Sequence, residues 1–239
     1  MDTITTPSPL VGTPPPDRDV QLRERIMEYV LRDTDPGRQG SIKRLYTSWR
    51  DWNKEHFEQL MVVPLIFLNE PSNPRRLGDC GPVSGFGCSS QIRIRPSLLT
   101  GTHPRMRAGA AYAEGRFTFV ADVLLHEMVH QWQQEVSGQR DEGYHGHGPA
   151  FRGKANEIGA RLGLPPVRTS KRRGKDAGLP SCSYWPYIVR GAGFYHGAYV
   201  PASGDAKKPG IIVPADLDGA CSVLREHFDI DALCKRLQA

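Results

Sequence analysis

The segment His126-Glu127-Met128-Val129-His130 constrains this chain more than any other part of its 239 residues. Two histidines four positions apart lie on the same face of a helix, one turn from each other. From there both imidazoles can reach a single Zn²⁺ at about 2.0–2.1 Å. Glu127 projects toward another side of the helix, beside the metal, where it can take a proton from metal-activated water. The spacing is that of the HExxH motif of zinc hydrolases.

The flanking sequence predicts that this motif lies on a buried helix. From Phe117 to Glu135, apolar residues occur almost all round the helix, as in a helix that other elements cover on every side. Two imidazoles and a carboxylate in such a place need a reason, because the burial of unpaired polar groups is costly. The alternative is a pair of hydrogen-bonded core histidines without a metal. We predict instead a Zn²⁺ cofactor with His126 and His130 as ligands and Glu127 as the catalytic base.

A catalytic zinc needs a third protein ligand and one open position. In the longer metzincin motif a third histidine would fall at position 136, which is Val136, so that class is excluded. The nearest histidines downstream are His145 and His147, within the segment EGYHGHGPAF (142–151). Glu157, on the helix predicted to follow, is an alternative ligand of the thermolysin kind. The residues alone leave these three candidates open.

The segments HEMVHQW (126–132) and GHGPAF (146–151) together resemble the SprT-like zinc metallopeptidases, also called the SprT/Spartan type. The resemblance implies that the histidine of the HGPxF block, here His147, is the third zinc ligand. It extends upstream to residues 45–68, which match the family's helix and first strand, and to residues 76–78 and 92–99, which match its next strand pair. Many bacterial members end in a four-cysteine zinc ribbon, and this chain lacks the paired cysteines to form one.

The fold that the resemblance implies is α+β: a zincin-like (minigluzincin-type) metallopeptidase domain with a buried active-site helix and a small antiparallel sheet. Apolar periodicity independently predicts helices over residues 17–33, 41–60 and 149–162, and strands over 62–68 and 91–95. We expect a disordered arm over residues 1–16, the metallopeptidase domain over 17–166, and a C-terminal extension of unknown role over 167–239. The extension opens with a basic run, residues 168–175, which is typical of a linker.

Composition and charge limit where in the cell this protein is expected and which partners it is expected to bind. The five cysteines include no CxxC pair, which favours reduced thiols in a cytoplasmic protein. No apolar stretch is long enough to span a bilayer and the first residues lack the pattern of a secretory signal, so no membrane partner is expected. The net charge of +5 and the basic run are compatible with a DNA partner, which the resemblance also implies.

Taken together, the sequence predicts a zinc-dependent metallopeptidase that hydrolyses peptide bonds of a protein or peptide substrate, with DNA-associated proteins as one candidate class. One alternative is a zinc-stabilised module that binds nucleic acid or protein with little catalysis, although a structural site has no use for Glu127 and would normally close with a fourth ligand. Another is a non-peptidase metal hydrolase such as a deformylase, with Cys88 as a ligand. The candidates for stabilising an oxyanion are Tyr112, Arg140, Tyr144 and His145.

Overall fold

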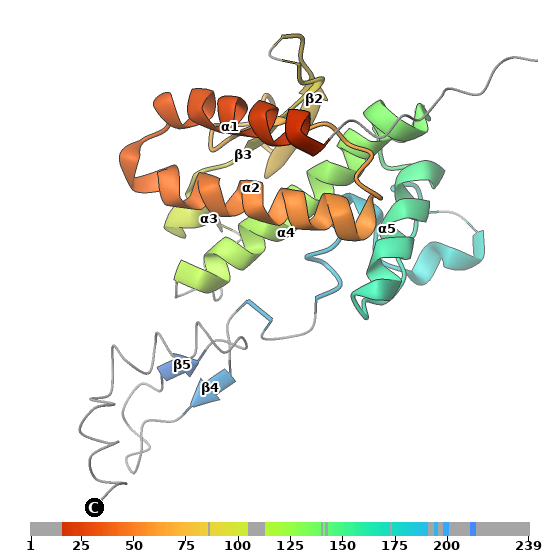
Figure 1. Cartoon of the computed structure of the whole chain (residues 1–239). Helices are drawn as coiled ribbons and strands as arrows, with labels where there is room; N and C mark the ends of the chain where they lie inside the picture. The colour runs from red at the N-terminus through yellow and green to blue at the C-terminus, as the bar shows by residue number, and fades with distance from the viewer. Residues whose placement is uncertain are drawn as a thin grey trace, which may run out of the picture.

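In the computed structural model, helices and a small sheet form a mixed α+β arrangement (Figure 1). The structure describes residues 16–85, 87–104, 113–139, 141, 143–172, 174–190, 194–195, 198–200 and 211–213. Apart from Pro16, where the first helix begins, the expected N-terminal arm lies outside these residues. The helices are α1 (Pro16–Arg32), α2 (Pro36–His56), α3 (Ser97–Thr100), α4 (Ala113–Trp132) and α5 (Pro149–Arg161). The strands are β1 (Leu65–Phe67), β2 (Gly78–Pro82), β3 (Ser90–Ile94), β4 (Ala198–Val200) and β5 (Ile211–Val213).

Helices α1 and α2 lie side by side, and both contact β1 (Figure 1). Helix α2 begins earlier than the apolar pattern predicts, because Asp35 caps it. The Asp35 carboxylate accepts a hydrogen bond from the Gly37 N–H, and Pro36 occupies the first turn, where its missing N–H costs nothing. The buried face of α2 then packs on β1 and α4. It consists of Ile42, Leu45, Tyr46, Trp49, Asn53 and His56.

The three-stranded sheet has the order β1-β3-β2 and is mixed. Strand β2 pairs with β3 in antiparallel fashion, but β1 pairs with β3 in parallel, so the prediction of an antiparallel sheet is wrong for half of the pairing. The reason is that β3 takes the centre, where Ile92 and Ile94 are fully buried on the core side. Strand β2 is therefore an edge strand, and it lies against α4.

Helix α4 is buried along most of its length, as the sequence predicts, and a π-helical turn (Gln133–Ser137) extends it. One glycine allows β2 to approach it closely. A Cβ atom at Gly78 would lie 3.0 Å from both Glu127 Oε1 and Val123 Cγ1, closer than ordinary packing permits. Within the described ranges, no helix is both long and apolar enough to cross a membrane.

Residues beyond 166 also pack into the core, so side chains from both sides of the expected domain boundary are buried together. Cys182 and Trp185 are fully buried, and Cys182 is a free thiol like Cys80 and Cys88. Farther along, Arg190 donates two hydrogen bonds, of 2.8 and 2.7 Å, to the buried carboxylate of Asp122 on α4. The Tyr195 hydroxyl donates to the same carboxylate. This segment is therefore attached to the helix that carries the HExxH motif.

We expect Arg190→Ala to lower the free energy of unfolding by about 3 kcal/mol, because it leaves the buried Asp122 charge without its cation. The Asp122 side chain is only 3% exposed, so water cannot replace the lost partner. Urea denaturation at pH 7 measures the change. The control is Arg152→Ala, which breaks a pair with Asp176 whose side chains are 39% and 37% exposed, and should cost less than about 1 kcal/mol. Equal losses in the two variants would contradict the prediction.

Candidate metal centre

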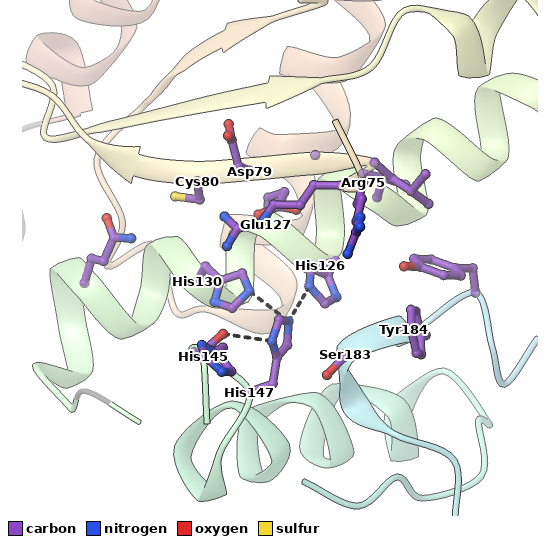
Figure 2. A pocket seen from close by; sticks show the side chains of 17 residues that line it. Arg75, Asp79, Cys80, His126, Glu127, His130, His145, His147, Ser183 and Tyr184 are labelled. Carbon is purple, nitrogen blue, oxygen red and sulfur yellow. Dashed lines mark hydrogen bonds between the residues drawn. The ribbon is translucent and has the colours of Figure 1, made fainter. Parts of the chain in front are cut away.

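The side chains of His126, His130 and His147 bring their Nε2 atoms together (Figure 2). The Nε2 atom of His147 lies 3.0 Å from that of His126 and 3.2 Å from that of His130. All three potential ligand atoms lie within 4.8 Å of one another. Helix α4 supplies two of these residues, one turn apart, and the loop of residues 143–148 before α5 supplies the third. We call these residues the histidine cluster; it is the ligand set that the sequence predicts.

The hydrogen bonds at the other ring nitrogens show that the cluster fits a cation. The Nδ1 atoms of His126 and His147 lie 2.6 Å and 3.0 Å from the carbonyl oxygens of Trp185 and His145. A carbonyl oxygen only accepts, so these Nδ1 atoms carry the protons and the Nε2 atoms present lone pairs. Lone pairs this close repel each other unless a cation lies between them. In a tetrahedral zinc site the ligand nitrogens lie about 3.3 Å apart, close to the two distances measured from His147.

His130 is oriented by an amide rather than by a carbonyl. Its Nδ1 lies 3.1 Å from Gln133 Oε1, and the Nε2 of the same amide donates to Asp141 at 2.8 Å. Because the amide donates to the carboxylate, its oxygen must face the imidazole, which places the proton of His130 on Nδ1. All three histidines are therefore held in the tautomer that a metal requires.

Burial keeps these histidines neutral. Loss of solvation lowers the pKa of His130 to about 3 and that of His147 to about 4, and it holds the pKa of His126 well below its ordinary value. For His126 and His130 the neighbouring imidazoles are the second cause of the lowered pKa. The cluster is thus in the neutral form at pH 7, the form in which histidine binds metals.

Glu127 lies beside the cluster without belonging to it. Its carboxylate faces β2 and accepts a hydrogen bond from the backbone N–H of Cys80 (Figure 2). Burial, with a smaller contribution from the nearby charge of Asp79, raises the pKa of Glu127 to about 8. A cation on the histidines would oppose this shift, because an opposite charge favours the ionised carboxylate. The geometry is that of a proton acceptor next to a metal rather than that of a ligand.

Asp141 connects the two parts of the chain that carry the ligands. Besides the Gln133 amide, it accepts hydrogen bonds of 2.9–3.1 Å from the N–H groups of Gly148, Ala150 and Phe151, at the first turn of α5. Gly148 allows this approach, since a Cβ atom there would lie 2.6 Å from the carboxylate. Asp141 thus caps α5 from outside the helix and fixes the loop that carries His147. Sequence reasoning missed it, although the absence of a capping side chain at Gly148 was a usable signal.

We expect Asp141→Ala to weaken zinc binding by about 10–100-fold, the usual cost of removing an outer partner of a ligating histidine. The loss follows because Gln133 would no longer be held against His130 and the loop of His147 would lose its anchor. Competition with a chromophoric chelator measures the affinity. Asp51→Ala, at a side chain that is 56% exposed on α2, is the control and should bind zinc as the wild type does. If Asp141→Ala bound zinc as tightly as the wild type, Asp141 would not support the histidine cluster.

The segment after residue 166 also takes part in the site. The carbonyl of Trp185, which orients His126, follows the short helix η4 (Cys182–Tyr184). The basic run expected to be a linker is folded against the loop of the third ligand, where the Ser170 N–H donates to the His147 carbonyl at 2.9 Å. Sequence reasoning missed the role of Trp185, because a backbone carbonyl leaves no signature in the sequence.

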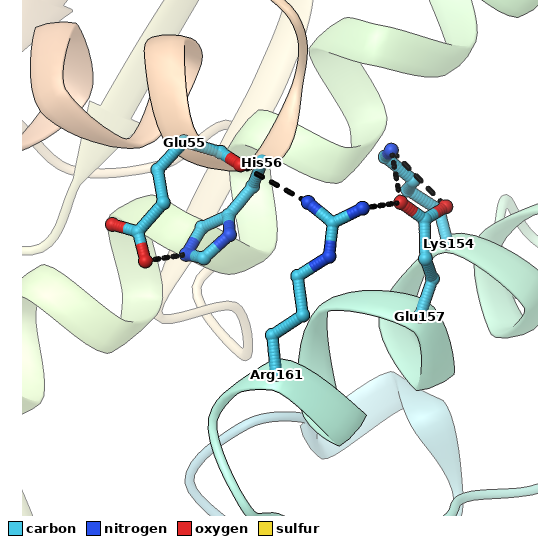
Figure 3. Close-up of polar contacts among 5 residues, drawn as sticks. All are labelled: Glu55, His56, Lys154, Glu157 and Arg161. Atoms are coloured by element: carbon cyan, nitrogen blue, oxygen red, sulfur yellow. Dashed lines mark hydrogen bonds and ion pairs between the residues drawn. The ribbon is translucent and has the colours of Figure 1, made fainter.

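The other predicted ligands lie elsewhere. His145 offers its carbonyl, not its ring, to the cluster. Glu157, on α5, is paired with Lys154 at 3.0 Å and with Arg161 at 2.9 Å (Figure 3). Cys88 donates its thiol to the Gly85 carbonyl at 3.2 Å, in the connection between β2 and β3. None of the three belongs to the histidine cluster.

The cluster opens into a cavity of about 320 Å³, which we call the metal pocket. Of the residues predicted to stabilise an oxyanion, His145 lines this pocket, whereas Tyr144 lies under the ammonium of Lys171. Tyr112 and Arg140 lie outside the described residues. The structure adds candidates that the sequence analysis did not single out, among them Arg75 and Tyr184 (Figure 2).

No protein-family model, curated protein or solved structure matches this chain. Its function therefore has to be argued from the geometry of the site.

Proposed function

We propose that this protein is a zinc-dependent metallopeptidase of the SprT-like type, with a zincin-like domain that hydrolyses peptide bonds. One observation carries the proposal: three neutral imidazoles present their lone pairs to one point at a pocket, with Glu127 beside them. Within the described part of the chain, no fourth histidine, cysteine or carboxylate joins the cluster. A structural zinc site would normally close with such a ligand, so an open fourth position favours catalysis over a binding module.

The residues divide the work of hydrolysis. Zinc, when bound, lowers the pKa of water and polarises the carbonyl to be cleaved. The histidine cluster holds the metal, and Glu127 accepts a proton from the attacking water and delivers it to the departing amine. Arg75 and Tyr184 line the same pocket, and we propose them as the donors of hydrogen bonds to the developing oxyanion.

The position of β2 at the edge of the sheet favours an extended peptide as the substrate. In an antiparallel pair, only every second residue of a strand exchanges backbone hydrogen bonds with its partner strand. The bonds from the Val83 N–H to the Ser89 carbonyl and from the Arg95 N–H to the Leu77 carbonyl show that these are the odd-numbered residues of β2. The peptide groups of Gly78 and Cys80 therefore point the other way, toward α4, where the Cys80 N–H already meets Glu127. A peptide chain laid along this edge would pair with the backbone carbonyls of Gly78 and Cys80, but not with the Cys80 N–H, which Glu127 already occupies.

The same geometry disfavours the deformylase alternative. That alternative needs Cys88 as a ligand, and its thiol lies outside the histidine cluster and is bonded to a backbone carbonyl. Burial also raises the pKa of the Cys88 thiol, whereas a metal ligand has to be a thiolate.

The test is to measure zinc content together with proteolysis of an unfolded protein such as reduced casein. We expect stoichiometric zinc, cleavage that stops on treatment with 1,10-phenanthroline, and recovery when Zn²⁺ is added back. Zinc-loaded protein that cleaves neither casein nor a mixed peptide library would overturn the proposal in favour of a binding module.

A DNA partner is a separate proposal, supported by the net charge of +5 and by the position of the basic run against the third-ligand loop. If Arg172 and Lys175 contact phosphates, replacing both with glutamine should reduce the slope of log affinity against log salt by about 2. Fluorescence anisotropy with duplex DNA measures the slope. The control replaces Lys43 and Lys54, exposed on α2, and should leave the slope unchanged. Binding that does not respond to salt would contradict the proposal. Arg173, in the middle of the run, lies outside the described residues.

A further inference from the structure

A second cavity, of about 850 Å³, adjoins the metal pocket, and we call it the second hollow. It shares His130, Gln134 and Gly146 with the metal pocket, so the two are continuous. It lies at the Pro82 end of β2 and reaches the connection between α2 and β1. Anything that extends along the edge of β2 from the metal therefore enters it.

One wall of the second hollow is apolar. Leu60 and Val62 form this wall with Pro82, and their exposed fractions are 40% and 37%. A single exposed apolar side chain on a protein surface needs no explanation. Here two of the large apolar residues that the described chain exposes lie in the same cavity, next to a candidate catalytic centre.

Hydrogen bonds fix the backbone of this wall, and the two residues before it have strained backbone conformations. Just before it, Glu58 and Gln59 have φ values of 57° and 58°, in the left-handed region that side chains other than glycine rarely adopt. The Asn53 side chain holds the Met61 backbone at both its N–H and its carbonyl. Val62 is fixed on the other side, where its N–H donates to Glu135 and its carbonyl accepts from Gln131. Such retained strain is typical of segments that serve a site.

The hollow contains two carboxylates, and each already accepts four hydrogen bonds from the protein. Glu135 accepts hydrogen bonds from Val62 N–H, from the Ser89 and Ser90 hydroxyls and from the Gln131 amide. Asp141 likewise accepts from the Gln133 amide and three backbone N–H groups. These hydrogen bonds hold each carboxylate in place and offset part of its charge, which weakens its attraction for a substrate ammonium or guanidinium. The described lining also contains no lysine or arginine, so an acidic side chain of a substrate would find no cation there.

We propose that the second hollow is a substrate subsite that receives a large aliphatic or aromatic side chain of the peptide to be cleaved. Leu60 and Val62 are then its specificity-determining residues, and the substrates are extended or unfolded segments with a bulky apolar residue near the scissile bond. This inference rests on the proposed peptidase function and deepens it. The substrate is the occupant because the hollow continues the metal pocket past the Pro82 end of β2.

The experiment separates binding from cleavage by using the zinc-loaded Glu127→Gln variant. Fluorescent peptides in which one position at a time is Leu, Phe, Ala, Lys or Glu are titrated and followed by anisotropy. At one position we expect Leu and Phe to bind about 10–100-fold more tightly than the other three, as burial of a large apolar side chain implies. The double substitution Leu60→Ser and Val62→Thr in this background should abolish the preference, with zinc content and thermal stability unchanged.

The control is Val20→Ser, at an apolar residue of α1 that is 42% exposed and does not line the hollow. It should keep the preference. A preference for Lys, no preference at any position, or a preference that survives the double substitution would each overturn the inference. Cleavage of the same peptides by the wild-type protein is measured in parallel. Cleavage without an apolar preference overturns the subsite alone, whereas preferential binding without any cleavage overturns the peptidase function.

Discussion

Replacing Glu127 with glutamine should leave zinc in place and reduce peptide hydrolysis by about 10²–10⁴-fold, the contribution of a general base. The metal should stay because the carboxylate is not part of the histidine cluster. Glutamine is close in size to glutamate, and its amide oxygen can still accept the hydrogen bond from the Cys80 N–H. Zinc content by mass spectrometry and kcat/KM on a fluorogenic peptide measure the two effects separately.

The matched control for this experiment is Glu157→Gln. Glu157 is 44% exposed on α5 and pairs with the buried Lys154 and the exposed Arg161, outside the histidine cluster, so the variant should keep both zinc and activity even if its stability falls. If Glu127→Gln purified without zinc, Glu127 would be a metal ligand, and its assignment as the proton acceptor outside the ligand set would be wrong. Full activity in that variant would show that another group accepts the proton.

Replacing His147 with alanine should reduce zinc affinity by more than the 10–100-fold that loss of an outer partner costs, because one of three direct ligands disappears. The remaining pair on α4 would hold the metal through two nitrogens only. We therefore expect His147→Ala to purify without stoichiometric zinc and without activity. Chelator competition and circular dichroism show whether the metal is lost from a protein that is still folded.

The control distinguishes His147 from its neighbour. His145 contributes its carbonyl to the site and has a φ of 51°, so alanine there would add backbone strain. Asparagine tolerates this conformation better than most residues. His145→Asn should therefore retain zinc. Zinc loss in His145→Asn with retention in His147→Ala would reverse the assignment of the third ligand.

The candidate site was largely readable from the sequence, and the reason lies in helical geometry. A spacing of four residues places His126 and His130 on one face whatever the rest of the fold does. The apolar residues on all sides of α4 likewise predict its burial, which the structure confirms. His147 came from the resemblance of its block to a family rather than from geometry, because a ligand in a loop has no periodicity.

Other features could not be predicted because they depend on tertiary contacts. The β1–β3 pairing joins strands of three and five residues, which are too short for their own pattern to decide which neighbour lies on which side. Asp141 lies in a loop and becomes a cap only when α5 packs beside the π-helical turn. Trp185 acts through its carbonyl, which every residue has.

The hydrogen bond between His126 and the Trp185 carbonyl joins residues that are 59 positions apart, and this separation has a consequence for biosynthesis. A ribosome releases the chain from its N-terminus, so the histidine cluster leaves the ribosome before Trp185 does. Until then, His126 lacks the group that fixes its ring, and Asp122 lacks Arg190. A nascent chain of this protein would therefore expose all three histidines of the cluster before the residues that orient and anchor α4 have been released.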